Sequence, residues 1–172
     1  TPLKTSWSFA VSGALTTTTT FGSTSLEPIG LAQYIVKYNA TGAEQWATAI
    51  QGAATITAMD TDAEGNLYVA GKFADEILVC DVAENQTSLV SSNSDSQTAA
   101  FIAKYSATGT LIAAQACEAT VDATVNDSFM YFGYPAEISI NNIQVEGDAL
   151  YVSFTYNGDV TLGGFSLDAK YL

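Results

Sequence analysis

An internal repeat constrains this chain more than any other feature of its sequence. The segment at residues 34–42, YIVKYNATG, returns at residues 101–109 as FIAKYSATG, displaced by 67 positions and identical at six of nine residues. Each copy alternates large with small or polar side chains and ends at a glycine. This pattern is typical of a β-strand that enters a tight turn, where glycine supplies a positive φ. The repeat therefore predicts a fold assembled from copies of one strand-and-turn unit.

A second element occurs three times. Residues 67–69, Leu-Tyr-Val, match residues 150–152 and, more loosely, Phe-Ala-Val at residues 9–11. Another apolar residue follows ten positions after each valine, namely Phe21, Val79 and Leu162. Equal spacing in three copies predicts one hairpin used three times, the first of them spanning about residues 7–26.

The order of these elements predicts an all-β chain of antiparallel hairpins without helices. After the first hairpin, strands are expected near residues 33–38, 44–50, 54–60, 66–71, 76–82, 100–105, 110–117, 137–145, 149–156 and 159–167. The chain is treated as one domain, with a half unit at 1–30, a unit at 31–98 and a second unit at 99–172. A repeated meander is typical of β-propeller blades, and 172 residues would hold about two and a half of them. A β-sandwich built from the same hairpins is the alternative.

The motifs of the first unit, in their order, resemble the bacterial β-propeller repeat. A strand with Lys-Tyr at residues 37–38 leads to a turn at Gly42, then Trp46, then a Gly-Asn turn at 65–66 before a Tyr-Val-Ala-Gly strand. The second unit departs from this pattern, since Ala113 stands where the first unit has Trp46. Members of this repeat group are mostly extracellular or surface proteins of bacteria, and the repeat carries no catalytic residue. The resemblance thus implies a bacterial protein that is secreted or displayed at the cell surface.

The number of blades creates a further expectation. A closed propeller needs at least four blades, and open sheet edges favour pairing with another chain. The chain is therefore expected to be a fragment of a longer propeller, or to be completed by a protein partner or a second chain.

Composition excludes several kinds of function. The chain has no histidine and its five positive charges are all lysine, so Ser-His-Asp catalysis, His-based zinc sites and guanidinium clamps on phosphate cannot be built. A net charge of −13 with scattered lysines argues against nucleic acid as a partner. No apolar run is long enough for a membrane span. The carboxylates stand in no recognisable catalytic motif, and we expect neither an enzyme nor a cofactor.

Two local features leave alternatives open. Asp60, Asp62 and Glu64 precede Gly65 in the spacing of a calcium loop, but a solvated hairpin turn explains them as well. Cys80 and Cys117 are interpreted as two small buried apolar residues. A single disulfide between them is the alternative, which spacing does not decide.

An insertion supplies the predicted binding residues. The repeat offset grows from 67 to 83 across the second unit, which places 16 extra residues there, and an aromatic insertion is assigned to about 120–136. It contains Phe129, Tyr131, Phe132 and Tyr134, which could anchor a protein partner or stack on a sugar; burial over an open sheet face is the alternative.

We expect a surface or adhesion module that acts through protein–protein interaction. A glycan-binding module of a bacterial nutrient-acquisition system is the second hypothesis.

Overall fold

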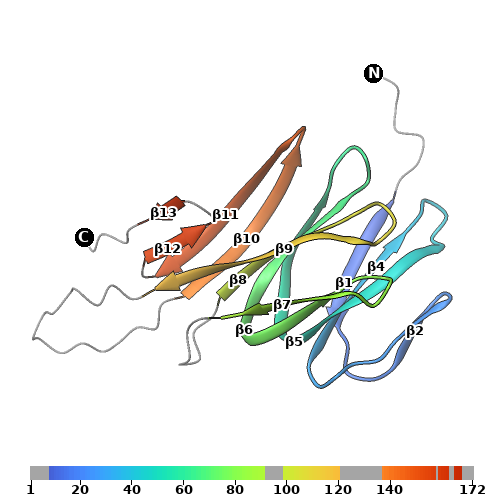
Figure 1. Cartoon of the computed structure of the whole chain (residues 1–172). Helices are drawn as coiled ribbons and strands as arrows, with labels where there is room; N and C mark the ends of the chain where they lie inside the picture. The colour runs from blue at the N-terminus through green and yellow to red at the C-terminus, as the bar shows by residue number, and fades with distance from the viewer. Residues whose placement is uncertain (1–7, 92–98, 121–136, 158, 163–164, 168–172) are drawn as a thin grey trace, which may run out of the picture.

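The computed structural model describes residues 8–91, 99–120, 137–157, 159–162 and 165–167. These residues form thirteen β-strands and no helix, and every strand pair among them is antiparallel (Figure 1). The predicted all-β fold of antiparallel strands is confirmed. No helix that could cross a membrane occurs in these ranges.

Most strands agree with the sequence prediction, but some predicted strands merge, the strand expected at 159–167 is two strands, and the strand at 86–90 was not predicted. Their bounds are β1 Phe9–Ala14, β2 Thr19–Phe21, β3 Thr24–Leu26, β4 Ala32–Tyr38, β5 Glu44–Thr61, β6 Leu67–Cys80, β7 Gln86–Val90, β8 Ala99–Tyr105, β9 Leu111–Thr120, β10 Glu137–Glu146, β11 Ala149–Asn157, β12 Asp159–Leu162 and β13 Phe165–Leu167. Thus β5 joins the strands expected at 44–50 and 54–60, and β6 joins those expected at 66–71 and 76–82.

The two long strands change partners along their length. The largest sheet runs β1-β4-β5-β6-β8-β9-β12-β13, with β7 also paired to β6. Residues 44–51 of β5 pair with β4, and its residues 50–61 pair with β6. The register shifts next to Gly52, whose φ is 104°. A Cβ there would lie 2.5 Å from the Glu76 carbonyl oxygen, so the bend needs glycine.

The described strands pack in three layers. Layer 1 is β1, β4 and residues 44–51 of β5; layer 2 is residues 54–61 of β5, residues 67–73 of β6, β8 and β9; layer 3 is the β10–β11 hairpin. One core cluster joins layer 1 to layer 2, and a second joins the opposite face of layer 2 to layer 3. Layer 2 is therefore covered on both faces, with β10–β11 beside it in Figure 1.

Hydrogen bonds also connect neighbouring layers. The Trp46 indole N–H donates to the Ala107 carbonyl oxygen over 3.0 Å and so ties layer 1 to the turn between β8 and β9. Between layers 2 and 3, the Thr57 hydroxyl donates to the Ile140 carbonyl at 2.6 Å. The Val145 N–H donates to Asp60 Oδ2 at 2.7 Å. Both interfaces thus combine apolar packing with bonds that set the position of one layer on the next.

Four turns share one hydrogen-bonding pattern, and they join β4 to β5, β5 to β6, β6 to β7 and β8 to β9. They span residues 39–43, 62–66, 81–85 and 106–110. In each, the first and fifth residues bond through N–H and C=O, and the fourth N–H donates to the first carbonyl. The side chain of each first residue also accepts from the fifth N–H: Asn39, Asp62, Asp81 and Ser106. The strand-and-turn prediction at the nine-residue repeat is confirmed.

The prediction of one hairpin used three times is wrong. β1 pairs with β4, while residues 19–26 form the separate β2–β3 hairpin, and Val69 and Val79 lie on the same strand, β6. The spacing has another cause. A strand of a layer is followed each time by a short hairpin, formed by β2–β3, by the end of β6 with β7, and by β12–β13. β6 pairs with β8, so the main sheet contains strands of both predicted units, 31–98 and 99–172.

Candidate functional site

The repeat places equivalent residues at the two interfaces between layers. The offset of 67 relates β4 to β8 and the first part of β5 to β9. Lys37 lies opposite Trp46 in the β4–β5 ladder, as Lys104 lies opposite Ala113 in the β8–β9 ladder, and both ladders shift register directly after the lysine. At an offset of 67, the layer 1 residues that face layer 2 therefore correspond to the layer 2 residues that face layer 3. The five pairs are Ile35 and Ile102, Lys37 and Lys104, Trp46 and Ala113, Thr48 and Gln115, and Ile50 and Cys117.

At these five positions the first interface is closely packed. All five layer 1 members of these pairs are buried, including Trp46 at 4% exposure and Lys37 at 3%. The Trp46 ring lies 5.8 Å from the Tyr105 ring, measured between centroids. It also lies against Gly109, where an added Cβ would come within 2.9 Å of the indole. The indole thus fills the space between β5 and the turn of layer 2.

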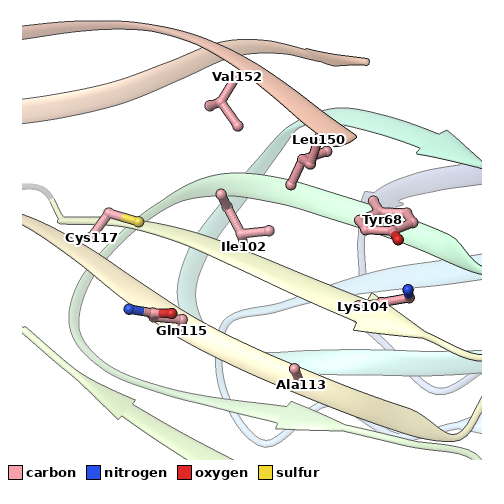
Figure 2. Close-up of a pocket in the computed structure, with 8 residues that line it drawn as sticks. All are labelled: Tyr68, Ile102, Lys104, Ala113, Gln115, Cys117, Leu150 and Val152. Carbon is pink, nitrogen blue, oxygen red and sulfur yellow. The ribbon is translucent and has the colours of Figure 1, made fainter. Parts of the chain in front are cut away.

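The second interface holds a groove of about 410 Å³. Its walls come from β6, β8 and β9 on one side and from β11 on the other (Figure 2). The lining residues are Tyr68, Ile102, Lys104, Ala113, Gln115, Cys117, Leu150 and Val152. Five of them are the counterparts of the buried layer 1 residues. Leu150 and Val152 correspond, at an offset of 83, to Leu67 and Val69, which are fully buried at the first interface.

The groove has a simple cause in the sequence. Ala113 replaces the whole indole of Trp46, and Cys117 is smaller than its counterpart Ile50. Protein interiors are close-packed, so removal of a large side chain leaves a space unless the neighbours collapse into it. Here they do not, since Ala113 and Gln115 are exposed. The eight lining residues enclose a space that we term the interlayer groove.

Lys104 provides positive charge at one end of the interlayer groove. Its Nζ lies 4.7 Å from the centroid of the Tyr68 ring and 3.9 Å from Asp62 Oδ2. The pKa of Lys104 is raised above its ordinary value, mainly by its interaction with Tyr68 and further by the charges of Asp62 and Glu64. Burial lowers this pKa, but by less. The ammonium is therefore charged at neutral pH, and Asp62 balances part of that charge.

The counterpart lysine has a different environment. Lys37 is buried and donates to the carbonyl oxygens of Gly65 and Ala107, at 2.5 and 3.4 Å. Burial lowers its pKa, while the charge of Asp62 opposes this effect. Lys37 thus binds the turns of the neighbouring layer, whereas the Lys104 side chain is 32% exposed beside the interlayer groove.

Both cysteines are free thiols, which decides between the two alternatives left by the sequence. Cys117 lies on β9 at the end of the groove opposite Lys104 (Figure 2), and burial raises its pKa to about 11. Cys80, half-buried on β6, has its pKa raised by burial and then by the charge of Asp81. Neither thiol is a thiolate at neutral pH, so neither has the character of a reactive nucleophile.

Two of the three carboxylates of the possible calcium loop, Asp60 and Asp62, form hydrogen bonds within the fold. Asp60 accepts from the N–H groups of Thr61 and Val145, and Asp62 accepts from the backbone and side chain of Asn66. The expected hairpin turn is present. Its residue Asp62 is buried, however, and is therefore not solvated. Within the described ranges, no three His, Cys, Asp or Glu residues are grouped so that they could hold a metal ion.

The binding residues expected from the sequence, Phe129, Tyr131, Phe132 and Tyr134, lie outside the described residues. Sequence reasoning missed the interlayer groove itself. One signal for it was visible, namely the replacement of Trp46 by Ala113 between the two units. A search with protein-family models, curated proteins and solved structures finds no match to this chain.

Proposed function

We propose that this chain is a non-catalytic binding module, part of a bacterial β-propeller that is secreted or exposed at the cell surface. It acts through protein–protein interaction. Two observations support this role. The sequence repeat resembles that of bacterial β-propellers, and successive layers of strands stack face to face. Layer 2 has a neighbouring layer on each face, as a blade within a propeller would have, which supports the proposal.

The interlayer groove carries the proposal of binding. The same residue positions form a closed core at the first interface and an open apolar groove at the second. Concave, mostly apolar sites with a few polar groups at the margin are typical of binding sites, and partners commonly place an anchor side chain in such a space. Lys104 and Gln115 supply polar groups beside the apolar walls.

Direct binding with purified components tests the proposed function. Polypeptides retained by the immobilised chain from the bacterial surface fraction would be identified, expressed and titrated against the chain by calorimetry. We expect at least one purified polypeptide to bind saturably, with a stoichiometry confirmed by native mass spectrometry. Saturable binding on a glycan array, without binding of any purified polypeptide, would contradict the proposal and favour the glycan-binding alternative.

A further inference from the structure

We infer that the interlayer groove accepts the flat aromatic side chain of a protein partner, in the space that an indole occupies at the equivalent interface. This inference rests on the proposed function and specifies the chemistry of the partner. It starts from the pairing of Trp46 with Ala113. At the first interface the chain supplies its own indole from β5, and at the second interface the same position on β9 is alanine.

The shape of the interlayer groove suits a ring. In Figure 2, Ile102 of layer 2 faces Leu150 and Val152 of layer 3, and these side chains form the apolar walls of the groove. The side chain of Ala113 is only a methyl group, so it leaves the space between the walls unfilled. Their counterparts Ile35, Leu67 and Val69 are all part of the core cluster that contains Trp46. Positions that belong to the indole-containing core at one interface thus line an open groove at the other, where the indole is absent.

The polar groups beside the interlayer groove also favour a neutral aromatic ring. An ammonium attracts the face of an aromatic ring, and Lys104 already lies over the Tyr68 ring at 4.7 Å. Gln115, exposed beside Ala113, offers an amide oxygen to an indole N–H or a phenol. An anionic ligand is disfavoured, because Asp62 lies 3.9 Å from the Lys104 ammonium and the chain carries a net charge of −13.

The probe for this site is N-acetyl-L-tryptophanamide, which carries the indole side chain without charge. Its titration into the isotope-labelled chain is followed through amide shifts in two-dimensional NMR, with N-acetyl-L-leucinamide as the aliphatic control. We expect saturable shifts at the amides of Ile102, Ala113 and Val152 with the indole probe. The aliphatic control should bind roughly tenfold more weakly or worse.

Two variants test the position. Ala113→Trp should fill the interlayer groove from within, remove the shifts caused by the probe and raise the melting temperature. Ile112→Trp is the matched control, because Ile112 is the exposed neighbour on the same strand and lines no part of the groove. It should leave probe binding unchanged. For a protein partner found by direct binding, Ala113→Trp should weaken the complex at least about tenfold, and Ile112→Trp should not.

Several results would overturn the inference. These are equal binding of the indole and leucine probes, probe binding that survives in Ala113→Trp, or a lower melting temperature of that variant. Probe binding that appears only after Tyr131→Ala and Tyr134→Ala would identify the chain's own insertion as the occupant instead of a partner. A purified partner that binds Ala113→Trp as tightly as the unaltered chain would refute this inference while leaving the proposed function intact.

Discussion

Glu84 is the residue that departs from the pattern of the four equivalent turns. The fourth turn position has a positive φ in all of them, and it is glycine at residues 42, 65 and 109. Glu84 has a φ of 63°. The left-handed region costs a residue with a Cβ about 1–2 kcal/mol, which is more than the extra backbone entropy that glycine loses on folding. The turn between β6 and β7 therefore holds local strain that the other three turns lack.

Replacing Glu84 by glycine should stabilise the protein. We expect Glu84→Gly to raise the free energy of unfolding by about 0.5–1 kcal/mol, seen as a higher urea midpoint at an unchanged slope. Gly42→Glu is the matched reverse change, because an added Cβ at Gly42 meets nothing within 4 Å and only its φ of 79° is at stake. It should lower the midpoint, and a Glu84→Gly protein no more stable than the parent would refute this account of the turns.

Asp81 should make stability depend on pH. Burial acts to raise the pKa of Asp81, but hydrogen bonds from Asn85, Ala83 and Leu111 together lower it below its ordinary value. Its contribution to stability is therefore complete above the unfolded-state pKa of about 3.9 and is lost as pH falls through the lower folded-state pKa. Asp81→Asn should lose stability at neutral pH and show a shallower decline between pH 5 and pH 2 in urea titrations. Asp148→Asn, at an exposed turn, should keep the decline of the parent.

At the level of the elements, the sequence identifies where the strands run but not how they join. Alternation and glycine turns locate nearly every strand, because period-two patterns and positive-φ glycines are local signals. Gly52 looks like a strand end in the sequence. In the structure Gly52 lies at a bend within one continuous strand, β5, and glycine is needed there because the backbone of Glu76 and Ile77 comes too close for a Cβ. Such an approach is a tertiary contact that a local pattern does not contain.

The bend of β5 gives a prediction at this scale. Gly52→Ala combines a positive φ with a Cβ placed 2.5 Å from a backbone oxygen, so it should destabilise by more than the positive φ alone, which costs about 1–3 kcal/mol. Gly42→Ala separates the two effects, since it has the positive φ without a steric contact. Thermal and urea unfolding of both variants measures the difference. Equal losses in the two variants would show that the approach to Glu76 is not what requires glycine.

At the scale of the whole molecule, the two interfaces have the same plan and different contents. The replacement of Trp46 by Ala113 was visible in the sequence, but its consequence was not. To foresee the interlayer groove, one must know that this face of β9 turns toward β11, and that pairing of layers is set by long-range packing. The sequence instead favours the aromatic insertion as a binding site, because aromatic residues in an insertion are a conspicuous local feature. A groove formed by an absent side chain has no such local signature.

The open second interface should make layer 3 the first of the three layers to open. Layer 1 and layer 2 share a core closed by Trp46, whereas layer 3 covers the interlayer groove, and local openings follow the density of buried contacts. Amide hydrogen exchange in the native state should give β10 and β11 lower protection than β6 and β8. Ala113→Trp should raise protection in β10–β11 alone, by filling the groove.

Trp46→Ala should instead lower protection of β4 and β5, and it should cost about 3–5 kcal/mol of global stability. Equal protection of all three layers in the parent chain would mean that the groove does not weaken its interface.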